Sequence, residues 1–131
     1  MKQPKKVYLI DTNILLRHVL ADHQVLSPKA RKIMDEIRSG KMKAEILEGV
    51  LIECVYVLNK FYKVPREKVA DTLIDILSYK GIVNKDKSEL INALKAYKAT
   101  QIDIVDHILA SKSTPEKPVL SFDKDFKNLD N

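Results

Sequence analysis

The sequence predicts an α/β protein, a three-layer α/β/α sandwich with a mainly parallel central sheet. Short apolar runs of strand length alternate with longer segments whose apolar residues recur at helical spacing. Strands that alternate with helices form a parallel sheet covered by helices on its two faces. A chain of 131 residues without an internal repeat or a long linker also fits one domain, residues 1–131.

The first elements follow from apolar runs and capping residues. Residues 7–10 are all apolar and predict a fully buried strand, after which Asp11-Thr12-Asn13 turns the chain into a helix ending near Leu20. Ser27 and Pro28 predict the start of the next helix, and Gly40 predicts its end.

The middle of the chain supplies the predicted central helix. Residues 43–47 predict a short strand, and residues 49–62 predict a helix that is apolar almost all round and therefore central. Pro65 ends that helix. Residues 67–79 form a clear amphipathic pattern that stops at Gly81.

The last part of the chain predicts two helices between strands. Residues 82–83 are a weak strand candidate, and residues 88–97 and 104–111 predict helices. Residues 118–122 predict the last strand, with a helical turn at 124–129.

Composition limits the class of protein. The net charge of +5 and the pI near 9.2 fit an anionic partner such as nucleic acid. Cys54 is the only cysteine, which excludes a disulfide or a cysteine-rich metal site within one chain. The N-terminal apolar run is too short for a signal peptide, and no run reaches the ~20 residues of a membrane span. A cytoplasmic protein is expected.

Isolated carboxylates inside or beside apolar segments are the main functional signal. They are Asp11, Glu53, Asp103, Asp106 and Asp123. Burying an unpaired carboxylate costs several kcal/mol, so such acids are expected to serve a purpose. The carboxyl ends of parallel strands share one edge of the sheet, where Asp11 and Asp123 would meet. Asp103 and Asp106, three residues apart, would share a helix face.

Four of these five acids also have a structural interpretation. Asp11, Asp103 and Asp123 could cap helices, and Glu53 could be buried against a lysine. Together these interpretations are weaker, because two carboxylates 5 Å apart repel by about 3 kcal/mol at an effective dielectric of 20. A hard divalent cation, Mg²⁺ or Mn²⁺, fits an oxygen-only donor set best. His107 is expected to be a partly exposed helix residue.

Four stretches of the chain resemble PIN-domain ribonucleases, and within them the small toxins of VapBC-type toxin–antitoxin pairs. The stretches, in order, are residues 7–17, 53–58, 102–110 and 120–126. Each is weak alone, but their order and spacing are specific, and with the intervening helices they span nearly the whole chain. The resemblance implies the PIN-like version of the α/β/α sandwich.

The resemblance also assigns residues. It implies metal-binding acids at Asp11, Glu53, Asp106 and Asp123, with Asp103 as an auxiliary acid. Thr12 and Asn13 would support the first acid. Ser121 stands where the family most often has threonine, and His107 replaces a usually small residue.

The function implied by the resemblance is a metal-dependent endoribonuclease that hydrolyses phosphodiester bonds with Mg²⁺ or Mn²⁺. A cognate antitoxin that covers the acidic cleft and a homodimer are the implied partners. Four basic residues are candidates for binding the RNA phosphates: Lys6, Arg17, Lys29 and Arg31.

Two alternatives remain open from the sequence. The chain could keep a PIN fold and bind nucleic acid without cutting it. It could instead be a phosphotransfer enzyme with Asp11 as the nucleophile. Haloacid-dehalogenase-like phosphatases carry a second Asp two residues after the nucleophile, whereas this chain has Asn13 there.

Overall fold

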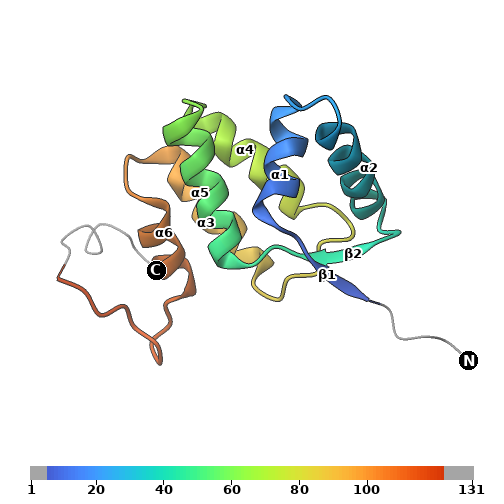
Figure 1. The fold of residues 1–131 in the computed structure, drawn as a ribbon. Helices are drawn as coiled ribbons and strands as arrows, with labels where there is room; N and C mark the ends of the chain where they lie inside the picture. Colours follow the sequence, from blue (N-terminus) through green and yellow to red (C-terminus); the bar gives the residue numbers. More distant parts are fainter. Residues whose placement is uncertain (1–5, 123–131) are drawn as a thin grey trace, which may run out of the picture.

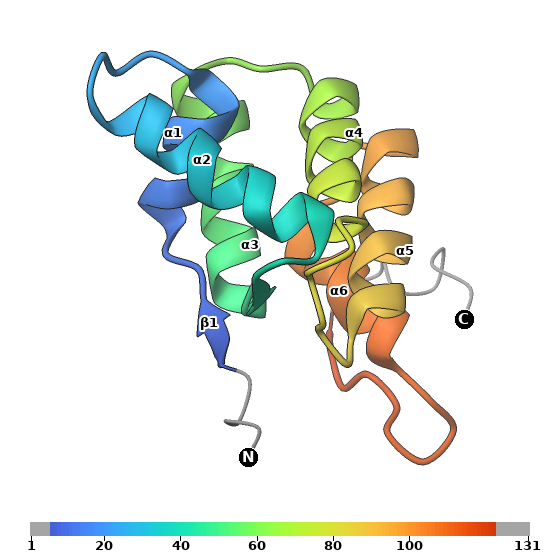
Figure 2. The ribbon, with the colours of Figure 1, turned by 90° about the vertical axis from the view of Figure 1, so that its right-hand side faces the viewer.

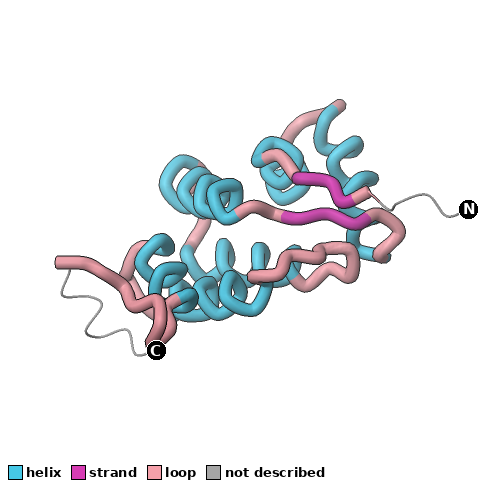
Figure 3. The backbone as a smooth tube through the Cα atoms, turned by 90° about the horizontal axis from the view of Figure 1, so that it is seen from below, coloured by secondary structure: helices cyan, strands magenta, loops and turns pink. Residues whose placement is uncertain are grey.

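The computed structural model describes residues 6–122, in which helices lie on both sides of a small parallel sheet (Figure 3). Strand β1 (Val7–Leu9) pairs with β2 (Lys43–Glu45) in parallel, with Val7 opposite Lys43 and Leu9 opposite Glu45. The weak strand candidate at 82–83 is an isolated parallel bridge from Ile82 to Ala44. The predicted α/β class with a parallel sheet is therefore confirmed.

The first half of the chain forms three helices. They are α1 (Thr12–Leu20), α2 (Leu26–Ser39) and α3 (Glu48–Tyr56), and α3 continues into a π-helical turn, η1 (Val57–Phe61). Helix α1 packs against both α2 and α3 (Figure 1). Gly40 ends α2 in the left-handed conformation, with φ of 84°, as predicted from the sequence.

The second half forms a helical layer of its own. It contains α4 (Arg66–Leu77), α5 (Lys87–Ala99) and α6 (Ile104–Lys112), with α5 packed between α4 and α6 (Figure 2). Helix α6 also contacts α3, so α3 lies between α1 and α6. Its inner side chains Leu51, Cys54 and Val55, and Leu58 of η1, are buried, which makes α3 the central helix, as expected.

Two predictions about strands are wrong. Val7, Tyr8 and Leu9 are 47%, 47% and 66% exposed, because β1 pairs along one edge only; in the segment 7–10, Ile10 alone is buried. Residues 118–122 form no strand and lead away from β1 (Figure 1), with Leu120 and Phe122 fully exposed. An apolar, β-favouring run forms a strand only where a partner edge is within reach.

The start of α2 also differs from the predicted cap. The helix begins at Leu26, and the ring nitrogen Nδ1 of His23 accepts the N–H groups of Val25 and Leu26 at 3.2 and 2.9 Å. The Ser27 hydroxyl instead accepts the N–H of His23 at 3.0 Å. Across residues 6–122, no helix combines the length and the apolar character needed to cross a bilayer.

Candidate active site

Asp11 stands at the junction of β1 and α1 with an exposed carboxylate. It is the N-cap residue of α1, and its backbone carbonyl accepts the N–H of Ile14 at 3.1 Å. Its side chain makes no capping hydrogen bond and is exposed. The capping interpretation therefore accounts for the backbone of Asp11 but not for its carboxylate.

Thr12 connects the first acid to the second. Its buried hydroxyl donates to Oε1 of Glu53 at 2.7 Å, a bond between the start of α1 and the middle of α3. The resemblance placed Thr12 in support of Asp11, whereas the structure places its hydroxyl on Glu53. Asn13 is exposed, and no hydrogen bond of its side chain is found within residues 6–122.

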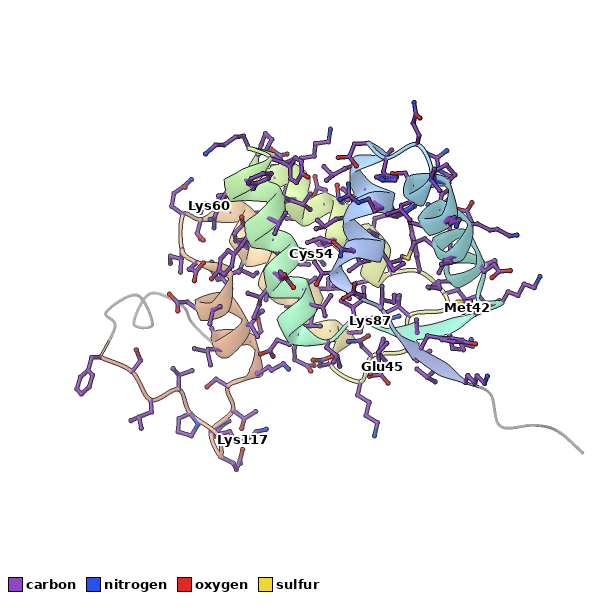
Figure 4. The ribbon with its side chains drawn as sticks, viewed as in Figure 1. Met42, Glu45, Cys54, Lys60, Lys87 and Lys117 are labelled. Atoms are coloured by element: carbon purple, nitrogen blue, oxygen red, sulfur yellow. The ribbon has the colours of Figure 1, made fainter. Side chains whose placement is uncertain are left out.

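The charges of Asp11 and Glu53 both influence the thiol of Cys54. Burial, together with the charges of the neighbouring carboxylates Glu53 and Asp11, raises the pKa of the Cys54 thiol to about 12. Figure 4 labels Cys54 midway along α3. Since both acids act on this one buried thiol, the carboxylates of Asp11 and Glu53 both lie near Cys54.

Glu53 is not buried, contrary to the sequence argument. It is exposed, although Val50 and Val57 on the same helical row are half-buried. A nine-residue α3 held between α1 and α6 leaves one narrow strip of its surface uncovered, and Glu53 lies in that strip. Among residues 6–122 no lysine pairs with Glu53 either, and the partner found there is the hydroxyl of Thr12.

Asp103 and Asp106 occupy the start of α6. Asp103 is the N-cap residue, and its carbonyl accepts the N–H of Asp106 at 3.1 Å. Its carboxylate makes no cap bond; both of its oxygens accept the hydroxyl of Tyr56, at 3.0 and 2.8 Å. Asp103 is exposed and Asp106 is half-buried.

Tyr56 was not identified from the sequence, and it connects α3 to these two acids. Burial, the Asp103 hydrogen bond and the charges of Asp103 and Asp106 raise the pKa of Tyr56 to about 12, so its hydroxyl remains a donor at neutral pH. Its position three residues after Glu53, on the same helix face, was the available signal.

The acids thus come from α1, α3 and α6, and α3 presents a contact to each of the other two helices. No group of three His, Cys, Asp or Glu side chains within residues 6–122 is close enough together to hold a metal ion. Asp123 lies outside the described residues, and Ser121, just before it, is exposed. The donors that are present, all carboxylate and hydroxyl oxygens, match the preference of Mg²⁺ or Mn²⁺.

His107 is buried, at 1% exposure, and the expectation of a partly exposed residue is wrong. Its Nε2 lies 2.7 Å from the hydroxyl of Thr100, which also accepts the N–H of Ile102. Burial lowers the pKa of His107, and the charge of Arg66 lowers it further. His107 is therefore neutral at physiological pH and holds the loop that precedes Asp103.

Arg66 fixes the same loop from the α4 side. Its guanidinium donates to the carbonyl oxygens of Tyr97 and Ile102 at 3.0 and 2.6 Å and lies 3.6 Å from the centre of the Tyr97 ring. Three side chains, from α3, α4 and α6, therefore position Asp103. A preorganised carboxylate of this kind is what a ligand site requires.

The basic candidates lie apart from α3. Lys6 is exposed before β1, and Arg17 forms an ion pair with Asp22 at 2.9 Å. Lys29 and Arg31 are on α2, on the far side of α1 from α3 (Figure 1). Arg31 lines a cavity of about 680 Å³ together with acidic residues of α2 and of the loop before it, Asp22, Asp35 and Glu36.

Comparison with known proteins agrees with the resemblance. Residues 8–131 match the model of the PIN domain family, so the chain belongs to that family. Among curated proteins it is similar to a VapC ribonuclease of Aquifex aeolicus (strain VF5), with 28% identity over 123 residues, which covers 92% of this chain and 90% of that protein. No solved structure matches significantly.

Proposed function

We propose that this protein is a metal-dependent endoribonuclease, the toxin of a toxin–antitoxin pair. The observation that carries the proposal is the Thr12–Glu53 hydrogen bond of 2.7 Å, which joins the residue next to the strand-end acid Asp11 to the acid of the central helix. Membership of the PIN family and similarity to a VapC ribonuclease support it.

The proposed metal ligands are Asp11, Glu53, Asp106 and Asp123, with Asp103 as an auxiliary acid. A bound Mg²⁺ or Mn²⁺ would activate water and stabilise charge on the leaving oxygen of the phosphodiester. Thr12 orients the Glu53 carboxylate through Oε1 and does not occupy its second oxygen. Tyr56 holds Asp103 at the start of α6. Each carboxylate then enters the reaction already oriented, which reduces the reorganisation it needs.

The test is cleavage of a mixed RNA panel in Mg²⁺, Mn²⁺ or EDTA. We expect wild type to cut with either metal and not with EDTA, and Asp11→Asn and Glu53→Gln to lose about 100-fold or more. Asp35→Asn, at an exposed acid of α2, is the matched control and should cut like wild type. Cutting in EDTA, or equal cutting by all variants, would refute the metal site.

The partners of the proposed toxin are an RNA substrate, a cognate antitoxin whose segment covers the acidic site, and a second copy in a homodimer, all in the cytoplasm. Co-expression with a small neighbouring reading frame should yield a complex that no longer cuts RNA. Sedimentation tests the homodimer separately, and a monomer would remove that part of the proposal alone.

A further inference from the structure

An aromatic and basic surface lies at the far end of the helix that carries Glu53. Tyr56, Phe61 and Tyr62 are 36%, 74% and 38% exposed. Burying a phenylalanine side chain stabilises a protein by about 1.5–3 kcal/mol, yet Phe61 stays largely in solvent. Its ring meets that of Tyr62 edge to face, with centroids 4.9 Å apart. Phe61 therefore contributes little to the core, and the exposed parts of all three rings are available to a ligand.

The π-helical turn brings this surface into line with the candidate site. In an α-helix, residues five apart point in different directions. A π turn, which is closed by a hydrogen bond between residues i and i+5, brings such residues closer to one face of the helix. The N–H of Tyr62 donates to the carbonyl of Val57 at 3.1 Å, which is this bond. The turn therefore brings Phe61 closer to the side of the helix that carries Tyr56, which itself shares a face with Glu53.

The turn is held in a fixed shape. The side-chain amide of Asn59 donates to the carbonyl of Val64 at 2.9 Å, and the N–H of Val64 donates to the carbonyl of Leu58 at 2.9 Å. Lys63 adopts the left-handed conformation, with φ of 59°, which few residues other than glycine take without cost. A fixed platform loses little conformational entropy when a ligand binds.

Two lysines flank the rings. Lys60 and Lys63 are exposed, and no ion pair among residues 6–122 involves either of them. Figure 4 shows Lys60 at the end of the helix beyond Cys54. Exposed aromatic rings beside unpaired cations are the combination that binds single-stranded nucleic acid, because bases stack on the rings and phosphates meet the cations.

We infer that this surface, formed by Tyr56, Lys60, Phe61, Tyr62 and Lys63, is a stacking platform for single-stranded RNA that leads to the acidic site. The inference rests on the proposed nuclease function and extends it by naming a path for the substrate. Phe61 follows Glu53 by eight residues, roughly 12 Å along a helix axis, a span of a few nucleotides. Lysine is depleted in the cores of protein interfaces, which favours RNA over a second protein copy as the occupant.

The experiment measures binding of a fluorescent twelve-nucleotide single-stranded RNA by anisotropy in EDTA. We expect Phe61→Ala to weaken binding about 5- to 150-fold, the range for losing one stacked base. Phe61→Trp, which keeps a stacking ring, should restore it. Val25→Ala, at an exposed apolar residue of the loop before α2, is the control and should bind like wild type. In Mg²⁺, the loss caused by Phe61→Ala should appear in KM and be recovered at saturating RNA.

The possible outcomes distinguish the stacking platform from the proposed nuclease function. Unchanged RNA affinity in Phe61→Ala, while wild type still cuts RNA and Asp11→Asn does not, would overturn the platform and leave the nuclease standing. A wild type that neither binds nor cuts RNA would overturn both. Sedimentation of the same variants completes the test. If Phe61→Ala turns a dimer into a monomer, the surface joins two copies and the inference is wrong.

Discussion

At the scale of single residues, the candidate site depends on hydroxyl groups that orient carboxylates. Thr12 and Tyr56 each donate to an acid of another element, Glu53 and Asp103. Hydrogen bonds to a charged group contribute about 1.5–3 kcal/mol, twice or more the value of a neutral pair. Neither donor is an acid, so a search of the sequence for acids does not find them. Their hydrogen bonds affect the orientation of the carboxylates more than the stability of the protein.

The first prediction concerns Thr12. In Thr12→Val the shape of the side chain is kept and the donor to Glu53 is lost, while the exposed carboxylate can turn to water. We expect RNA cleavage to fall about 10-fold with the melting temperature almost unchanged, and Thr12→Ser to restore activity because it keeps the hydroxyl. Cleavage assays with thermal melts check this; equal activity in Thr12→Val would show that the bond does not orient Glu53.

The second prediction concerns pH and His107. Its folded pKa lies below the ordinary 6.5, so below that pH the unfolded chain binds a proton that the folded chain resists. The free energy of unfolding should therefore be level above about pH 6.5 and fall on acidification. His18 adds a fall of the same sign, because burial and Arg38 lower its pKa as well.

The measurement is urea unfolding from about pH 7 to about pH 5. His107→Gln should reduce the slope of stability with pH and leave the part that belongs to His18. The comparison uses slopes, so it holds even if the variant is less stable throughout. An unchanged slope would mean that His107 does not carry the pH dependence.

At the scale of elements, the helices were predicted closely and the strands were not. The helix expected at 104–111 runs from Ile104 to Lys112, because apolar residues at helical spacing fix which face is buried. Strands here are three residues long, and their burial depends on which edge pairs with which. The π turn was not predicted either, since neither its hydrogen bond from the Tyr62 N–H to the Val57 carbonyl nor the Asn59–Val64 contact beside it leaves a pattern in the sequence. The acids could be named from the sequence, whereas Tyr56 was missed although its position three residues after Glu53 was a signal.

The third prediction uses two glycines in different elements. A Cβ on Gly81 would overlap the carbonyl oxygens of Met42 and Ile37, where the loop after α4 presses on the strand region. Gly49 lies in the first turn of α3 with nothing near its Cα hydrogen. We expect Gly81→Ala to cost about 3 kcal/mol, a fall of roughly 10 °C in Tm, and Gly49→Ala to gain about 0.5 kcal/mol.

Thermal melts followed by circular dichroism test both glycines. Both variants add one methyl group, one in a crowded place and one in an open place. The difference between their melting temperatures therefore reflects the surroundings of each glycine. A Gly81→Ala variant as stable as wild type would show that the loop after α4 can move away from Met42 and Ile37. Such freedom would also weaken the Ala44–Gly81 hydrogen bond as a support of the sheet.

At the scale of the whole molecule, the net charge of +5 does not make every cation equally able to attract RNA, because some cations are paired with acids. At the C-terminal end of α2 two positive charges have acids beside them: Arg38 pairs with Asp35 at 3.5 Å, and Lys41, just after the helix, pairs with Glu36 at 3.7 Å. Lys112 is held between Glu48 and Asp86 at 2.8 and 2.9 Å. The charge available to attract an anionic strand therefore lies mainly where cations have no such neighbours.

The last prediction turns this uneven distribution into a salt dependence. Each phosphate neutralised on a single strand contributes about −0.7 to the slope of log K against log salt. Replacing Lys60 and Lys63 together by Gln should reduce that slope by about 1.4, if each meets one phosphate. Replacing Lys29 and Arg31 on α2 by Gln removes the same formal charge and should leave the slope almost unchanged. RNA binding titrations at several salt concentrations distinguish the two pairs. A larger change from the α2 pair would place the strand across α2, as the sequence alone suggested, and not along the helix that carries Glu53.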